Sequence, residues 1–198
     1  TGDMTNSSTN MDQYGAYKSA MSQINPAIPV YHIPGNHDVK PLEEGSLNSY
    51  KDKYGEDRFS FEFEDSYFIG INTSLIIDGP EDAEQEQKSW LEEQLSKASG
   101  SNHIFVFMHC PIVTRQIDEP DTYSNFPISK REEYVDILDK YHVDAVWAGH
   151  LHQSFECHLK NFRMITCGPS GKPLGKGYSG FNMVLFSKNE FSYKYIPL

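Results

Sequence analysis

The sequence lacks the features of a membrane-spanning or disulfide-stapled protein. Among its 198 residues there are only three cysteines, Cys110, Cys157 and Cys167, an odd number without the spacing of a zinc site or a redox pair. No apolar run approaches the roughly 20 residues that cross a bilayer, and the first residues show no basic-then-apolar signal pattern. These features predict reduced thiols in a cytoplasmic setting and no membrane partner.

Basic residues are also scarce. The chain has 17 Lys and Arg against 28 Asp and Glu, so its net charge is -11. This balance argues against a broad nucleic-acid-binding surface, although a few cations or bound metal ions could still hold one phosphate. A hydrophobic content of 38% is ordinary for a globular protein, and the length predicts a single domain over residues 1–198.

Residues 28–38 are the stretch around which the chain is organised, an apolar run followed at once by Pro-Gly-Asn-His-Asp. The β-forming residues of 28–33 predict a buried strand that ends at the proline and glycine. Asn36, His37 and Asp38 would then leave the carboxyl edge of a sheet, where open α/β sheets bind ligands. They offer a metal ligand, a proton carrier and a group that orients this carrier. Taken alone, the same residues also fit a capped turn with a surface histidine.

The spacing of apolar residues predicts a mixed α/β fold. Helices are expected over 14–24, 47–54, from Pro80 to a stop at Gly100, and over 129–141 with Ser129 as cap. Strands are expected over 28–33, 58–64, 67–72, 104–108, 143–148, 155–159, 164–167, 181–186 and 191–196. The first helix would lead into strand 28–33 as part of a β-α-β unit. Residues 114–128 form a polar loop long enough to border a cleft.

Each polar cluster that could carry chemistry follows a predicted strand. Asp3 belongs to what resembles a turn after a strand, His109 directly follows one apolar run, and His150 and His152 follow the next. Together with Asn36 they supply one carboxylate, one amide oxygen and three imidazoles, a mixture that suits Mn, Fe or Zn. The two-residue spacing of His150 and His152 lets both rings point one way, each towards a different metal.

These residues resemble the motifs of the calcineurin-like metallophosphoesterase family, which run D-x-[HQ], G-D-x, G-N-H-[DE], H and G-H-x-H. The matching segments are Gly2-Asp3, Gly35-Asn36-His37-Asp38, His109 and Gly149-His150-Leu151-His152. The resemblance is specific and spans nearly the whole chain. Residues 49–55, 59–61 and 174–176 are further similar to the branch called calcineurin-like phosphoesterase domain-containing protein 1.

The resemblance implies a four-layer α/β/β/α sandwich with a two-metal site at the strand ends. Asp3 would bridge two divalent ions, Mn, Fe or Zn, with Mg as a further candidate. Asn36, His109 and His150 would complete one site, and His152 would belong to the other. Two cations about 3.5 to 4 Å apart acidify a bridging water, so that hydroxide can attack phosphorus in line at neutral pH.

The resemblance also implies roles for the two residues that follow Asn36. His37 would not bind metal but would face the leaving group, as general acid or as a stabiliser of charge on the phosphate. Asp38 would hold the His37 ring through a hydrogen bond.

The chain departs from the family pattern at its start, because the first motif has no counterpart. The predicted fold therefore lacks the first strand-helix unit, and only Asp3 and His152 remain for the second metal. A gap or raw edge in the central sheet is expected. We expect the sequence to be a fragment of a longer protein; the alternative is a truncated form with weak or absent catalysis.

The leading functional hypothesis is hydrolysis of a phosphomonoester substrate, with a phosphoserine or phosphothreonine protein as the candidate. The first alternative is a phosphodiesterase acting on cyclic nucleotides or other diesters, because the same metal core serves both. The second is a metal-binding module with impaired catalysis, against which the His37 and Asp38 pair speaks.

Several other residues are predicted to be structural. Cys110 is expected to be a small buried residue, and residues 168–180, with Lys172 and Lys176, to form β-turns instead of a phosphate loop. The histidines that match no motif are His32, His103, His142 and His158.

Overall fold

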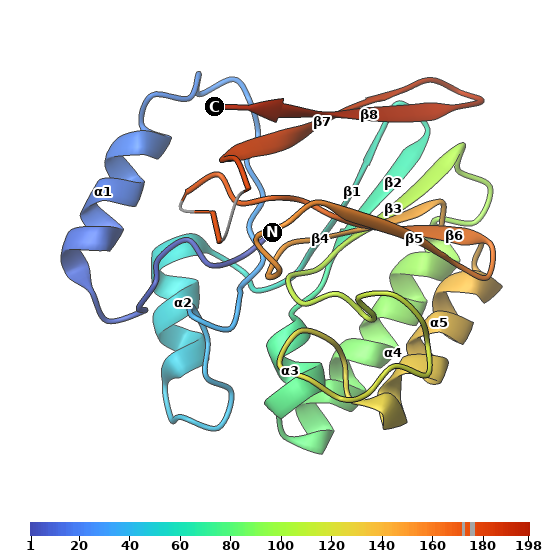
Figure 1. The fold of residues 1–198 in the computed structure, drawn as a ribbon, viewed down its shortest axis with the longest axis horizontal. Helices are drawn as coiled ribbons and strands as arrows, with labels where there is room; N and C mark the ends of the chain where they lie inside the picture. The colour runs from blue at the N-terminus through green and yellow to red at the C-terminus, as the bar shows by residue number, and fades with distance from the viewer. Residues whose placement is uncertain (172, 175–176) are drawn as a thin grey trace.

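A six-stranded mixed sheet forms the centre of the computed structural model, which describes residues 1–171, 173–174 and 177–198 (Figure 1). The strand order is β1-β2-β3-β4-β6-β5. β2, β3, β4 and β6 run parallel, whereas β1 and β5 pair antiparallel at the two edges. The bounds are β1 Phe59–Phe63, β2 Ser66–Gly70, β3 His103–Phe107, β4 Ala145–Ala148, β5 Phe155–Leu159 and β6 Phe162–Thr166.

Helices cover one face of this sheet and a β-hairpin covers the other (Figure 1). The covering helices are α3 Thr73–Asp78, α4 Glu81–Lys97 and α5 Ile128–Lys140. The hairpin consists of β7 Gly180–Phe186 and β8 Phe191–Pro197, which pair antiparallel as a second sheet. Two further helices, α1 Met11–Met21 and α2 Ser46–Tyr54, lie beside these layers near the start of the chain.

The apolar core has two parts because side chains alternate across the central strands. Val106 of β3 and Val146 of β4 face the helices and pack in the larger cluster with Leu91 and Leu138. Their neighbours face the hairpin, and Phe105, Ala145, Trp147 and Ile165 pack there against Val184, Phe186, Phe191 and Tyr193. The uninterrupted apolar run before His109 is thus explained, because a strand covered on both faces has no polar side.

Most of the predicted elements are confirmed. The antiparallel β1–β2 pair turns at Glu64 and Asp65, both at positive φ, as expected from the alternation of Phe59, Phe61 and Phe63. The predicted cap of α5 is wrong: the helix begins at Ile128 after Pro127, without a side-chain cap hydrogen bond. The sequence patterns also missed α3, whose six residues are too few for a helical period.

The prediction of a strand over 28–33 is wrong, and with it the β-α-β unit. These residues belong to no helix or strand, and Ile28, Val30 and Tyr31 are exposed. No described strand pairs with the segment, so it has no neighbour to complete a backbone ladder. The preceding helix ends at Met21 instead of 24. Neighbouring strands of the six-stranded sheet are all hydrogen-bonded, so it contains no gap, which was one of the two expected outcomes; the other, a raw edge, stays a prediction.

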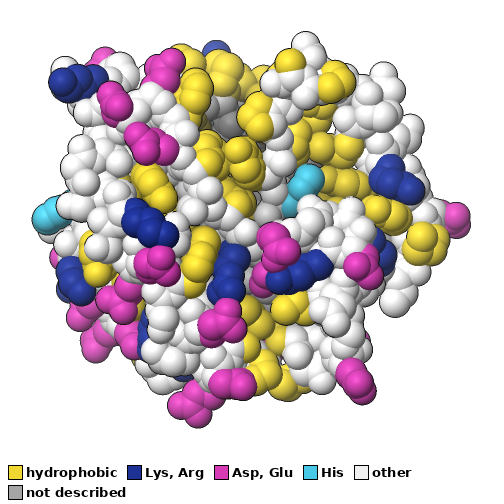
Figure 2. All heavy atoms as spheres, turned by 180° about the vertical axis from the view of Figure 1, so that it is seen from behind, with side chains coloured by type: hydrophobic (Ala, Val, Ile, Leu, Met, Phe, Trp, Pro, Cys, Tyr) yellow, Lys and Arg dark blue, Asp and Glu magenta, His cyan; other side chains and the backbone are white. Residues whose placement is uncertain are grey.

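Apolar side chains are exposed beside this segment and on the outer face of the hairpin. Figure 2 shows hydrophobic side chains gathered near the top centre of the rear face, with charged ones at the upper left and over the lower half. Phe181, Met183 and Leu185 alternate with the inward-facing residues of β7 and are 45%, 42% and 62% exposed. In Figure 1 no helix covers that outer face, and no helix among the described residues is long and apolar enough to cross a membrane.

Candidate functional site

Two glycines allow the first residues of the chain to reach the loop at 35–38. A Cβ on Gly2 would lie 2.5 Å from Nδ1 of His109, and one on Gly35 would lie 2.1 Å from Oδ1 of Asp3. Only glycine fits such close approaches. Asp3, which follows Gly2, has a φ of 56°, a left-handed conformation that is uncommon for residues other than glycine.

Asp38 fixes this junction between the two segments. Its buried Oδ2 accepts the backbone N–H groups of Asp3 at 2.6 Å, Met4 at 3.3 Å and Gly35 at 2.9 Å. Burial is the main reason that the pKa of Asp38 is raised, and the N–H donors partly offset it. Asp38 therefore shapes the backbone that carries Asp3 and Asn36.

Four side chains converge at the carboxyl ends of β3 and β4. Nε2 of His109 lies 3.2 Å from Oδ2 of Asp3, 3.0 Å from Oδ1 of Asn36 and 3.1 Å from Nδ1 of His150. Ligand atoms of Asp3, His109 and His150 all lie within 4.8 Å of one another. The structure thus brings together four of the five residues that the sequence predicted as metal ligands.

Backbone carbonyls set the tautomers of both histidines. Nδ1 of His109 donates to the Thr1 carbonyl at 2.7 Å, and Nε2 of His150 donates to the Tyr123 carbonyl at 2.7 Å. The other nitrogen of each ring is then directed at the cluster. Such outer hydrogen bonds orient histidines that bind metal.

The charge state of the cluster favours a cation. Burial alone would raise the pKa of Asp3, but its hydrogen bonds and charge interactions with His109 and His37 outweigh burial and lower the pKa. Burial, helped by the nearby His109, also lowers the pKa of His150 and so disfavours its charged form. The oxygens of Asp3 and Asn36 and Nδ1 of His150 are all acceptors, and a divalent ion would satisfy them together.

His37 stands next to this cluster. Its backbone N–H donates to Oδ1 of Asp3 at 3.0 Å, and its ring Nδ1 donates to the Asn6 carbonyl at 3.0 Å. The expectation that Asp38 orients the ring is therefore wrong. Oδ2 of Asp38 accepts three backbone N–H groups, and Oδ1 is buried without a hydrogen-bond partner among the described residues. The Asn6 carbonyl orients the ring instead and leaves Nε2 of His37 for other chemistry.

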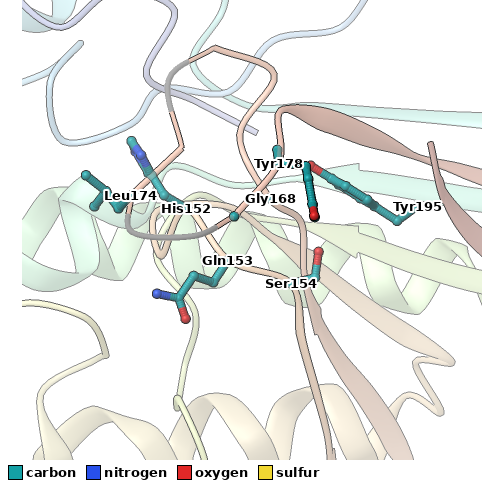
Figure 3. A pocket seen from close by; sticks show the side chains of 8 residues that line it. His152, Gln153, Ser154, Gly168, Leu174, Tyr178 and Tyr195 are labelled. Carbon is teal, nitrogen blue, oxygen red and sulfur yellow. The ribbon is translucent and has the colours of Figure 1, made fainter. Parts of the chain in front are cut away.

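His152 lies outside the tight cluster but borders the same cavity. That cavity has a volume of about 440 Å³, and its lining includes Asp3, His37, His109, His150 and His152. His152 also lines a neighbouring cavity of about 520 Å³. In Figure 3 its ring and Leu174 lie on one side of this second cavity, and Tyr178 and Tyr195 on the other. Both His150 and His152 have positive φ, 64° and 51°, as strained residues at functional sites often do.

A third cavity, of about 450 Å³, adjoins the cluster from the other side. Asn36, His109, His150 and Tyr123 line it where it meets the cluster. Its remaining walls are largely apolar and include Val39, Pro41, Leu42 and Ile77, with Lys40, Glu43 and Asp78 as charged residues.

The residues that sequence reasoning missed act mainly through their backbone. The carbonyls of Thr1, Asn6 and Tyr123 orient three histidines, and a carbonyl leaves no trace in the sequence. Tyr123 also contacts Asn36 through its hydroxyl. The one signal for Tyr123 was its place in the long polar loop at 114–128.

Two of the histidines outside the site make structural contacts. His103 is buried, with Nδ1 3.2 Å from Oδ1 of Asp144 and Nε2 2.8 Å from the Ser187 carbonyl, so it links β3 to the hairpin. His32 hydrogen-bonds to the hydroxyl of Tyr17. Cys110 is buried, as expected. Lys172 and Lys176 lie outside the described residues.

Comparison with known proteins agrees with this geometry. A family model described as calcineurin-like phosphoesterase matches residues 1–154, well over half of the chain. The chain belongs to the calcineurin-like phosphoesterase family. The match includes every residue of the cluster, as well as His37 and His152.

Two relatives of the chain differ in the kind of phosphate ester that their names indicate. The serine/threonine-protein phosphatase CPPED1 of Homo sapiens is 30% identical over 189 residues, which cover 91% of this chain and 60% of that protein. The probable glycerophosphodiester phosphodiesterase GpdQ of Arcobacter nitrofigilis is 31% identical over 77% of this chain and 55% of its own. The chain thus spans little more than half the length of the curated relatives that it matches.

Solved structures support the same fold for this family member. The purple acid phosphatase PPD1 from yellow lupin seeds has a TM-score of 0.69 at 15% identity and covers 98% of this chain and 43% of that one. GAP50 of Plasmodium, described as the anchor in the inner membrane complex, has a TM-score of 0.55 at 21% identity over 71% of this chain and 49% of its own. The predicted α/β metallophosphoesterase class is therefore confirmed.

Proposed function

We propose that this chain is a metal-dependent phosphoesterase that hydrolyses phosphomonoesters. The observation that carries the proposal is the convergence of Asp3, Asn36, His109 and His150, with His37 beside them, in one cavity. This arrangement combines a place for a divalent cation with a histidine that is able to transfer a proton.

The residues present fit such an ion. A carboxylate, an amide oxygen and two imidazoles form a donor set for Mn, Fe or Zn, with Mg as a weaker candidate because of its preference for oxygen. We further propose a second ion between Asp3 and His152. When bound, divalent ions lower the pKa of water and neutralise phosphate charge.

His37 is the candidate proton donor to the leaving group. Because Nδ1 donates to the Asn6 carbonyl, the second ring proton of the cationic form resides on Nε2. The backbone bond to Asp3 keeps this ring next to the cluster. Nε2 would transfer its proton to the ester oxygen as the bond to phosphorus breaks, so that the alcohol leaves neutral.

For the substrate, we favour a phosphoserine or phosphothreonine protein. The support is similarity to proteins named serine/threonine-protein phosphatase CPPED1. The alternative, a phosphodiester, is supported by the similarity to the probable glycerophosphodiester phosphodiesterase. The cavity beside Asn36 and Tyr123, with its apolar walls, would accept the organic part of either ester.

The test is metal content and turnover of the purified 198-residue chain. Elemental analysis gives the number of ions per chain, and hydrolysis of an aryl phosphate monoester and diester is measured with added Mn²⁺. Metal binding with faster monoester turnover is expected. Faster hydrolysis of the diester would make phosphodiesters, and not phosphomonoesters, the substrate class. Metal binding without turnover would identify an impaired metal-binding module.

We also propose a cytoplasmic location and a single domain. Cys110, Cys157 and Cys167 form no disulfide in the structure, and reduced thiols are typical of that compartment. The net charge of -11 favours a phosphorylated protein or small ester over nucleic acid as the partner. Cell fractionation with a specific antibody tests the location, and recovery in a secreted fraction would refute it.

A further inference from the structure

Tyr123 contacts two of the four clustered side chains from outside the cluster. Its hydroxyl accepts a hydrogen bond from Nδ2 of Asn36, and its backbone carbonyl accepts one from Nε2 of His150 at 2.7 Å. The Tyr123 and His150 rings also touch, with centroids 4.8 Å apart at 46°. One residue thus reaches both an amide and an imidazole of the proposed metal site.

The contact with Asn36 accompanies one orientation of the amide. With Nδ2 bound to the Tyr123 hydroxyl, Oδ1 lies 3.0 Å from Nε2 of His109, inside the cluster. An amide rotated by half a turn would place its NH₂ group there, and an NH₂ group cannot bind a cation. The hydroxyl therefore holds the Asn36 side chain from outside the cluster while the amide oxygen faces the ligand atoms.

The hydrogen bond between Nε2 of His150 and the Tyr123 carbonyl determines which ring nitrogen of His150 faces the cluster. Because Nε2 carries the proton donated to the Tyr123 carbonyl, Nδ1 presents its lone pair to the cluster. The carbonyl belongs to the backbone, so the loop must hold it in place.

The loop that carries Tyr123 is anchored by buried charged residues. Arg131 is fully buried and donates from Nε to the Phe126 carbonyl at 2.8 Å and from Nη1 to the Ile117 carbonyl at 3.1 Å. Glu119 accepts from the backbone N–H of Thr114 and from Nδ2 of Asn125, both at 2.6 Å. The side chain of Tyr123 is 71% exposed. The buried network beneath it nevertheless gives Tyr123 a defined position.

We infer that Tyr123 is a positioning residue of the metal site, which holds Asn36 and His150 in the orientation that binds a divalent ion. This inference rests on the metal site proposed above. Tyr123 supplies no metal ligand itself. It lines the cavity that is also lined by Val39 and Ile77, where this cavity meets the cluster.

The test is Tyr123→Phe in the full chain, which removes the hydroxyl and leaves the ring and the carbonyl. Mn²⁺ binding is measured by titration calorimetry. We expect the dissociation constant to rise by about tenfold, the range found when outer partners of metal ligands are removed. Turnover that falls at low Mn²⁺ and recovers at saturating Mn²⁺ is the matching kinetic result.

Tyr141→Phe is the matched control, because it removes the same group at the end of α5, beside the amino ends of the strands. A double-mutant cycle gives the sharper result. If the hydroxyl acts through the Asn36 amide, Tyr123→Phe changes Mn²⁺ affinity no further in an Asn36→Ala background.

Two outcomes would overturn the inference. One is unchanged Mn²⁺ affinity with a higher KM, which would make the hydroxyl a substrate contact. The other is an equal loss of affinity in the Asn36→Ala background. In either case, Mn²⁺ binding by the parent chain would leave the proposed function standing, whereas a parent chain that binds no Mn²⁺ would refute both.

Discussion

The carboxylate of Asp38 holds the backbone of Asp3 in place, with 2.6 Å between Oδ2 and the Asp3 nitrogen across 35 residues of sequence. The same oxygen also accepts from Met4 and Gly35, so one atom stabilises the junction of two loops. A carboxylate that accepts several N–H groups fixes a backbone more firmly than a neutral acceptor does.

Asp38→Ala should therefore lower the free energy of unfolding by about 3 kcal/mol, because the buried N–H groups lose their acceptor. Urea denaturation measures this change. Asp38→Asn is the control, since it keeps one oxygen in the same shape and should cost clearly less. Equal losses for the two variants would show that charge, and not the acceptor, is what the junction needs.

His37→Ala should lower kcat by about 10²- to 10⁴-fold, the usual contribution of a general acid. Mn²⁺ affinity should stay unchanged, because His37 lies beside the cluster and supplies none of its converging atoms. His158→Ala, on edge strand β5, is a control for histidine loss elsewhere. A parallel loss of Mn²⁺ affinity would mean that His37 helps to bind the ion.

His109→Ala should abolish the rise in melting temperature that Mn²⁺ is expected to cause. Nε2 of His109 lies within 3.2 Å of a ligand atom of Asp3, Asn36 and His150, so its removal takes away the atom that contacts all three. In the parent chain, Mn²⁺ should raise the melting temperature and a chelator should reverse this, since a ligand that binds only the folded state stabilises it. A rise in His109→Ala equal to that of the parent would place the ion elsewhere.

Glu119 predicts a pH dependence of stability. Burial would raise its pKa, but hydrogen bonds from Thr114, Asn125 and Gln116 outweigh burial and lower it. A lowered folded pKa means that Glu119 stabilises the fold above its ordinary pKa of 4.5 and loses this contribution as the pH falls through the folded value.

The stability difference between the parent chain and Glu119→Gln should thus be largest near pH 7 and shrink in acid. Urea denaturation at several pH values measures it. Glu62→Gln is the control, because Glu62 is exposed on β1 and should show no such trend. A difference that is constant across pH would show that the carboxylate charge has no role in holding the loop.

Local patterns in the sequence predicted the elements that are buried on a regular period. The run before His109 predicted β3, and the alternation of Phe59, Phe61 and Phe63 predicted β1. Residues 28–33 have the same β-forming composition but no partner strand. Strand formation depends on a neighbour, and a neighbour is a tertiary property that composition alone does not encode.

In the candidate site, too, some features could be predicted from local sequence and others depend on distant contacts. Side chains with distinctive chemistry, such as Asn36 and His109, were found from their place after apolar runs. The error about Asp38 arose because its neighbour in sequence, His37, was a plausible partner, while its actual partners are the N–H groups of a distant segment. Contacts to backbone carry no residue preference, so geometry alone shows them.

The cluster also joins distant parts of the chain. The bonds that build it span 34 residues from Asp3 to His37, 73 from Asn36 to His109 and 108 from Thr1 to His109. Closing such loops costs entropy that grows only slowly with their length, so a single ion shared by Asp3, Asn36 and His109 would act as a long-range clasp. Residues 1–6 belong to no helix or strand, and a bound ion would add to the hydrogen bonds with which Asp38 holds Asp3 and Met4. Their amide hydrogens should therefore exchange with solvent more slowly while an ion is bound than after its removal.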